Sequence, residues 1–162
     1  MLSPIEKYCT DIMANCTMTY AQYADMKSCV AAAAAFPPGM DTDMGGDTLG
    51  CRQYHVGVAS GDPAKHCPHA GPSGGAACGM TCDGFCDIAV ATCKTEWPDK
   101  AKCMTDCALI KSVGLPYSAT DSAMSPANTI ECRLYHLTVA ATDANSATMH
   151  CPHTAAFSPV CK

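Results

Sequence analysis

Apolar residues recur at helical spacing near the start of the chain, and polar residues mark where this pattern begins. Ser3 and Glu6 form a capping box, with Pro4 at the first helical position. Apolar side chains then follow at intervals of three and four residues, at Ile5, Cys9, Ile12, Met13 and Cys16. The pattern predicts a first helix over this segment.

An alanine-rich stretch predicts a second helix, because alanine has the highest helix propensity. We expect it to begin at Asp25 and to end at Phe36, where two prolines follow. A corresponding segment appears later in the chain. We expect that helix to begin at Pro98 and to end before Gly114.

A third helix is predicted to begin near Asp47, and its counterpart near Asn128. The Asn128 side chain is expected to cap the helix, with Glu131 three residues later. The two helices carry CRQYH and CRLYH, and each is followed by a loop and then by HCPH. The proline in HCPH predicts an irregular turn rather than a helix. Strand alternation is absent, so the expected fold class is mainly α.

The chain aligns with itself, and this repeat predicts two domains. Each copy has roughly 80 residues, a size at which an apolar core is marginal and disulfides are the usual supplement. We therefore expect a small disulfide-rich helical domain duplicated in tandem, with module 1 over residues 1–79 and module 2 over residues 80–162. The aligned cysteines are Cys9 with Cys86, Cys16 with Cys93, Cys29 with Cys103, Cys51 with Cys132, Cys67 with Cys151, and Cys78 with Cys161.

Composition limits the cellular location and the kinds of partner that we expect for this protein. The 162 residues carry a formal net charge of -5. Nucleic-acid-binding proteins usually carry an excess of basic residues, so this charge argues against that function. The 14 cysteines indicate pairing in an oxidising compartment, so we expect an extracellular, cell-surface or periplasmic location. The longest apolar run, CVAAAAAF, is too short to span a bilayer. The first residues lack a signal-peptide pattern, so we expect that an export signal has been removed or that Met1 is an expression start.

Two cysteines have no counterpart in module 1, and we expect them to bond to each other. They are Cys82 and Cys107, which align with Ile5 and Ala33. In an antiparallel helix hairpin, Cys82 lies opposite Cys107 and the aligned cysteines one turn inward face each other. These inner pairs are Cys86 with Cys103 and, by alignment, Cys9 with Cys29. The other four cysteines of module 1 leave three pairings open, of which we favour Cys16 with Cys51 and Cys67 with Cys78.

All six histidines lie in the two matched segments, three in each. If the helix and the HCPH turn face each other, three imidazoles converge in each module. Imidazole suits zinc, copper, nickel or iron, and three histidines leave a coordination position open for water, Tyr54 or Tyr135, or an outside ligand. The candidate cofactors are therefore copper, zinc or haem iron. The candidate ligands are His55, His66 and His69 in module 1, and His136, His150 and His153 in module 2.

A structural role is the alternative explanation for the same residues. Histidines beside disulfides often donate hydrogen bonds to carbonyl groups, and Arg52 would then pair with Asp62. Haem would have to be held mainly by histidine, because the C-x-x-C-H attachment motif is missing. The ten methionines do not match between the copies, which favours a packing or surface role for them.

The assembled motif resembles a known kind of module. The pattern N-T-x-x-C-R-x-Y-H, followed by H-C-P-H and preceded by a cysteine-bearing helix hairpin, is similar to tandem cysteine-rich modules of exported bacterial proteins. Asp47 replaces the asparagine in the first copy. The resemblance implies export and disulfide bonding, and it transfers no catalytic residue.

We therefore expect an exported binding or structural module of the cell surface or extracellular space, with a metal or redox cofactor held by one histidine cluster per module. Its expected partners are a second copy or a cell-surface protein, rather than nucleic acid. The alternative is a copper-dependent oxidase or electron-transfer protein, in which the two three-histidine clusters face each other.

Overall fold

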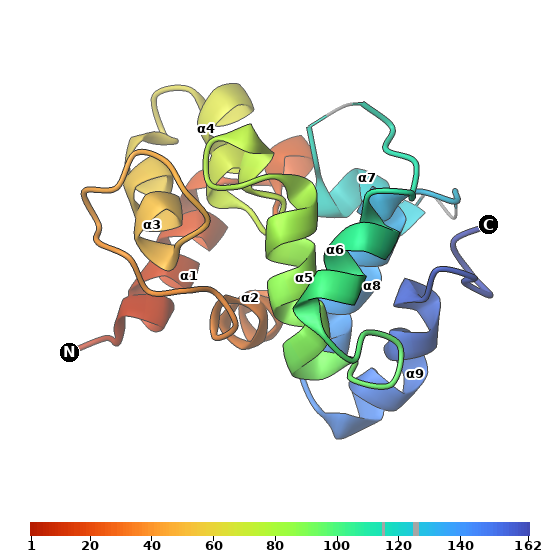
Figure 1. Cartoon of the computed structure of the whole chain (residues 1–162). Helices are drawn as coiled ribbons and strands as arrows, with labels where there is room; N and C mark the ends of the chain where they lie inside the picture. The colour runs from red at the N-terminus through yellow and green to blue at the C-terminus, as the bar shows by residue number, and fades with distance from the viewer. Residues whose placement is uncertain (115, 125–126) are drawn as a thin grey trace.

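The computed structural model describes residues 1–114, 116–124 and 127–162, and every regular element within them is helical (Figure 1). The predicted fold class, a mainly α and disulfide-rich fold, is confirmed. The α-helices are α1 (Pro4–Asn15), α2 (Met26–Ala33), α3 (Leu49–Val58), α4 (Pro63–Ala70), α5 (Thr81–Thr92), α6 (Lys100–Cys107), α7 (Ala119–Met124), α8 (Ile130–Ala140) and α9 (Ala144–Thr154). Two short 3-10 turns are η1 (Met18–Tyr20) and η2 (Gly74–Ala76).

The expected capping box at the start of α1 is confirmed. The Ser3 hydroxyl accepts from the Glu6 backbone N–H at 3.2 Å, and the Glu6 carboxylate accepts from the Ser3 N–H at 2.8 Å. The second helix begins at Met26, directly after the expected Asp25, which caps it, and it ends at Ala33, before Phe36. Its counterpart α6 begins after Asp99, whose carboxylate accepts from the backbone of its first turn, rather than at Pro98.

The expected capping of the third helix by Asn128 is wrong, although both third helices begin close to the expected positions. Thr48 and Thr129 are the caps, and their hydroxyls accept from the N–H of Cys51 and Cys132. A threonine directly before the first helical residue is well placed for this bond. The side chains of Asp47 and Asn128 are thereby left available for other partners, described below.

The HCPH segments are helical, contrary to the predicted irregular turn. They form the last turns of α4 and α9, with Pro68 and Pro152 inside the helices. Asp62 and Asp143 start these helices upstream of HCPH by capping their first turns. Each proline lies within the last three residues, so it interrupts few intrahelical hydrogen bonds.

Seven disulfides pair all of the cysteines, as expected. The predicted bonds Cys82–Cys107, Cys86–Cys103 and Cys9–Cys29 are confirmed. The favoured pairing of the remaining cysteines is wrong, because Cys16 at the end of α1 meets Cys67 of α4, although the same end of α1 also contacts α3 through the bond from Asn15 to the Val56 carbonyl. The bonds there are Cys16–Cys67 and Cys51–Cys78, with Cys93–Cys151 and Cys132–Cys161 at the aligned positions.

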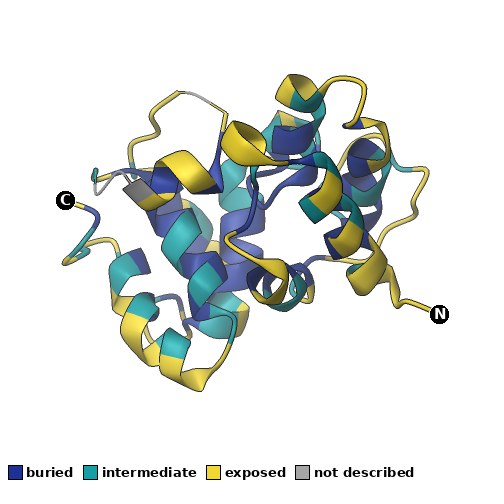
Figure 2. Ribbon diagram, turned by 180° about the vertical axis from the view of Figure 1, so that it is seen from behind, coloured by how far each residue is buried: buried dark blue, intermediate teal, exposed yellow. Residues whose placement is uncertain are grey.

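One continuous apolar cluster runs through the first half (residues 1–79) and the second half (residues 80–162) of the chain. Tyr8 and Ile12 of α1 belong to it, as do Phe85, Trp97 and Leu137 of the second half. Figure 2 shows the buried segments gathered in the middle of the molecule, with exposed turns around them. The division into two modules stays a prediction.

The residues that the structure describes include no helix with the length and apolarity needed to cross a membrane.

The disulfides are expected to contribute unequally to stability. Replacing Cys82 and Cys107 by alanine leaves the α5–α6 hairpin closed by Cys86–Cys103, so the unfolded chain gains little freedom. Replacing Cys93 and Cys151 opens a loop with a sequence separation of 58 residues and should cost more, within the ~2 to 5 kcal/mol typical of a native disulfide. Denaturant unfolding of the two double variants provides the comparison. An equal or larger loss for Cys82–Cys107 would contradict this view.

Candidate metal centres

Each group of three histidines is brought together by two consecutive helices. In the first half, α3 carries His55, and α4 carries the other two histidines of this set at a spacing of three residues. In the second half, α8 and α9 repeat this arrangement. The potential ligand atoms of each set lie within 4.8 Å of one another. The first cluster is therefore His55, His66 and His69, and the second cluster is His136, His150 and His153.

In the first cluster, the Nδ1 atoms face inward. The Nδ1 atoms of His55 and His66 are 3.0 Å apart. The Nε2 of His55 lies 3.2 Å from the carbonyl oxygen of Met44, which can only accept, so Nε2 carries the proton of this ring when it is neutral. The Nδ1 lone pair of His55 therefore points into the cluster. The Nδ1 of His69 is buried and has no hydrogen-bond partner within the described chain.

The second cluster has the same geometry. His136 Nδ1 lies 3.0 Å from His150 Nδ1 and 3.4 Å from His153 Nδ1. The rings of His136 and His150 have their centroids 5.2 Å apart at an interplanar angle of 25°, and the equivalent pair in the first cluster has the same values. Two segments that differ at many positions thus build one ring arrangement.

These separations are the ones that a bound metal ion requires. Nitrogens at about 2.0 to 2.1 Å from a tetrahedral metal lie about 3.3 Å from one another. The observed Nδ1 separations of 3.0 to 3.4 Å bracket this value. Three nitrogen ligands leave one tetrahedral position for water or another ligand.

Burial keeps these rings in the neutral form that binds metals. Desolvation lowers the pKa of His55, His69 and His150, and neighbouring histidines lower it further. The same causes lower the pKa of His136 to about 4. At neutral pH these rings are uncharged, so their lone pairs are available.

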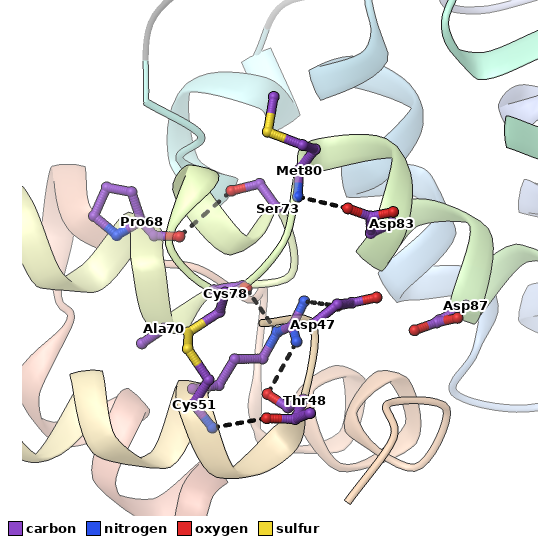
Figure 3. Close-up of polar contacts among 12 residues, drawn as sticks. Asp47, Thr48, Cys51, Pro68, Ala70, Ser73, Cys78, Met80, Asp83 and Asp87 are labelled. Atoms are coloured by element: carbon purple, nitrogen blue, oxygen red, sulfur yellow. Dashed lines mark hydrogen bonds and ion pairs between the residues drawn. A yellow bond between two sulfur atoms is a disulfide. The ribbon is translucent and has the colours of Figure 1, made fainter. Parts of the chain in front are cut away.

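A buried arginine holds each helix pair in place. Arg52 donates from Nε to the carbonyl of Gly71, just after α4, from Nη1 to the carbonyl of Thr48, and from Nη2 to Asp47 at 2.8 Å. Its guanidinium carbon also lies 3.8 Å from the centroid of the Phe36 ring. Figure 3 shows Asp47 and Thr48 close to the disulfide that Cys51 forms.

Arg133 does the same in the second half. It donates to the carbonyl of Ala155, just after α9, to the carbonyl of Thr129, and to the Asn128 side chain at 2.9 Å. These are the two arginines of the chain, and each ties the start of one histidine-bearing helix to the end of the other. The expected pairing of Arg52 with Asp62 is wrong, because Asp62 caps α4.

The disulfides Cys51–Cys78 and Cys132–Cys161 lie directly against the clusters. Their sulfur atoms come within 4.8 Å of a ring nitrogen of His55 and of His136. As disulfides they lack the thiolate form that binds metal. They therefore act as rigid supports for the first histidine of each cluster.

Sequence reasoning named all six histidines but missed two supporting groups. The carbonyl of Met44 could not be found from sequence, because a loop backbone carries no residue-specific signal. The side-chain partners of the two arginines do leave a pattern in the sequence, which the expected pairing of Arg52 with Asp62 did not use. In both copies a polar residue precedes a threonine, and an arginine follows that threonine four residues later.

Comparison with known sequences shows the family. A profile of the BfoA family C-terminal domain matches residues 3–83, which is half of the chain. The chain belongs to the BfoA family. The matched range of this BfoA-family protein contains the whole first cluster.

Curated relatives of this BfoA-family chain are fungal. It is 42% identical over 64 residues to the aurasperone B biosynthesis cluster protein A of Aspergillus niger, covering 39% of this chain and 21% of the relative. It is equally similar to the bifonsecin B biosynthesis cluster protein A of Aspergillus brasiliensis, covering 22% of that protein. The match thus spans about a fifth of the length of these relatives. No solved structure matches the chain.

The resemblance to exported bacterial modules is therefore wrong as a family assignment. The family profile and the Aspergillus relatives point to a fungal family. The motif that suggested bacterial modules consists of a helix cap, a disulfide, a buried arginine and the histidines. Such a set reflects shared structural needs and does not identify a source.

Replacing Arg133 by lysine is expected to destabilise the protein. A single ammonium group cannot replace the four hydrogen bonds of the guanidinium, and some buried acceptors lose their donor. We expect the free energy of unfolding to fall by ~2 to 4 kcal/mol, measured by denaturant titration. Lys102→Arg is the exposed control and should change it by less than ~0.5 kcal/mol. A loss for Arg133→Lys as small as that of the control would show that the hydrogen bonds of Arg133 contribute little to stability.

The depressed pKa of His136 predicts acid sensitivity of the metal-free protein. Because this pKa falls from 6.5 to about 4 on folding, the unfolded state binds the proton first as pH falls, and stability is lost between these values. Unfolding of the wild type and of His136→Asn at pH 7 and pH 4.5 tests this. The variant should gain relative stability at the lower pH.

The comparison with a variant is needed because another group acts in the opposite direction. Burial raises the pKa of Asp87 to about 6, so its contribution favours the folded state as pH falls from about 6 towards 3.8. Asp87 is present in both proteins, and its effect cancels in the difference. A difference that stays constant with pH would refute the role of His136.

Proposed function

We propose that the protein is an exported, disulfide-stabilised metal-binding protein with one three-histidine site in each half. The observation that carries this proposal is the convergence of inward-facing Nδ1 atoms at metal-ligand spacing, repeated in both halves. The support of each site by a disulfide and a buried arginine adds to it, because preorganised ligands lose little freedom when they bind an ion.

A purely structural role explains the histidines less well. A buried structural histidine satisfies its ring nitrogens with hydrogen bonds to carbonyls, hydroxyls or carboxylates. Here the Nδ1 of His69 is buried and unpaired within the described chain, and the Nδ1 of His55 faces another imidazole nitrogen. A cation between these rings would satisfy them together. The Met44 carbonyl then acts as the outer partner that orients His55.

The donor set favours zinc or copper over haem. Three imidazoles around one point suit an ion with tetrahedral or trigonal coordination. Haem iron takes protein ligands along a single axis, and three rings whose nitrogens are 3.0 to 3.4 Å apart leave no room for the macrocycle between them.

Two separate sites are favoured over one binuclear oxidase site. The first cluster belongs to α3 and α4, and the second belongs to α8 and α9. Figure 1 shows α3 and α9, which each carry part of one cluster, at opposite sides of the molecule. An oxidase that shares oxygen between two coppers needs the ions close together, which this placement does not provide.

The cellular setting and the repeat are part of the proposal. Seven disulfides support an oxidising, extracellular or cell-surface location. The matched disulfides, arginines and histidine rings support the origin of the two halves, residues 1–79 and 80–162, by tandem duplication. Self-association or a cell-surface protein partner remains part of the same proposal.

The test is metal stoichiometry in matched variants. The wild-type protein, freed of metal with a chelator and dialysed against zinc or copper, should bind two equivalents per chain by elemental analysis. His66→Ala and His150→Ala, which replace equivalent histidines, should each lose about one equivalent and keep the other. The double variant should lose both.

Exposed residues away from the clusters serve as the control. Lys94→Gln should leave two equivalents bound, because this side chain is exposed and belongs to neither cluster. A wild-type protein that binds no zinc or copper at micromolar concentration would end the proposal. A strongly coupled copper spectrum from a single pair of ions would instead favour the oxidase.

A further inference from the structure

A hollow of about 530 Å³ lies between the two halves, against one side of the first cluster. Its volume is in the range of small-molecule sites. Figure 3 shows Pro68, Ser73 and Met80, which belong to its wall, on neighbouring segments. The wall also includes Lys65 and His69 of α4, and Glu131 of α8.

His69 connects this hollow to the first cluster. Its Nδ1 belongs to the cluster, where it is buried and unpaired within the described chain. The opposite edge of the ring lies against the turn at Gly75, which also lines the hollow. A Cβ added to Gly75 would come 2.9 Å from the Cδ2 atom of His69, so only glycine permits this approach. Since Nε2 is bonded to Cδ2, it lies toward the same edge.

The outer nitrogen of His69 lacks the partner that His55 has. A metal-bound imidazole usually donates its other N–H to a carbonyl, a carboxylate or water. His55 donates to the carbonyl of Met44. For the Nε2 of His69, the described residues provide no acceptor within hydrogen-bond distance. A ligand oxygen in the hollow would supply one.

Charges on the wall indicate what kind of ligand fits. Lys65 is exposed, and its ammonium group forms no ion pair with any described residue, so it is available to an anion. On the side of the second half, the buried carboxylate of Glu131 accepts from the Ser112 hydroxyl and from the Val113 N–H at 3.2 Å. Carboxylate oxygens have lone pairs to spare, so Glu131 can also accept from a ligand hydroxyl. Pro68 and Met80 contribute apolar surface to the wall of the hollow.

We propose that this hollow binds a small hydroxy-carboxylic acid with an apolar ring. Its carboxylate accepts from the Nε2–H of His69 and from Lys65, and its hydroxyl donates to Glu131. The inference rests on the proposed metal site, because a metal on Nδ1 fixes the proton on Nε2. No histidine of the second cluster lines the hollow, so one ligand binds per chain although two metal ions do.

The experiment titrates the zinc-loaded protein with 4-hydroxybenzoate by calorimetry. The para arrangement avoids chelation of the metal by the probe. We expect one equivalent to bind, and we expect benzoate and 4-hydroxybenzamide to bind more weakly because each lacks one polar end. Lys65→Gln should weaken 4-hydroxybenzoate binding about tenfold, as expected for loss of one charged hydrogen bond at a partly exposed site. Lys94→Gln is the matched control and should not change the affinity.

The outcomes separate the ligand site from the metal sites. Two bound zinc ions without 4-hydroxybenzoate binding, or with binding that Lys65→Gln leaves unchanged, would overturn the ligand site and leave the metal sites standing. Two equivalents of 4-hydroxybenzoate would also overturn it, since both metals would then be binding the probe directly. If elemental analysis finds no zinc in the loaded protein, both proposals fail.

Discussion

Disulfide bonding is the constraint on which the rest of this structure depends. The helices are short, and much of the buried core consists of cysteine and alanine rather than large apolar side chains. Such helices are marginal in isolation. Each crosslink removes freedom from the unfolded chain, so a modest core suffices for a defined arrangement. The bonds also fix the helices at specific points, as Cys16–Cys67 and Cys51–Cys78 do for α4 and α3.

The buried arginines, together with the disulfides, fix the relative placement of the histidine-bearing helices. Burying a guanidinium is costly unless its nitrogens are hydrogen-bonded, and each of the three nitrogens of Arg52 and of Arg133 donates to a backbone carbonyl or to a polar side chain. Because these carbonyls lie at the start of one helix and just after the other, the pairing is satisfied at one relative placement of the two helices. That placement brings the imidazoles together. The arginine is thus a positioning residue for the histidines.

The two clusters share a geometry but differ in their surroundings. The first lies within the part of the chain matched by the BfoA family profile, and it borders the hollow between the halves. The second lies outside the matched part, and none of its histidines lines that hollow. The proposed metal sites are therefore alike in geometry, and the proposed ligand site adjoins the first of them alone.

Sequence determined the local features of this protein. The capping box at Ser3, the helical class, the pairing of Cys82 with Cys107 and the grouping of the six histidines follow from spacing along the chain, because they depend on residues within one or two helices. Only the tertiary structure decided the pairing of Cys16, the helical form of HCPH, the partners of Arg52 and the hollow beside His69. Each of these depends on which helices pack together, and that packing is set by contacts between residues far apart in sequence.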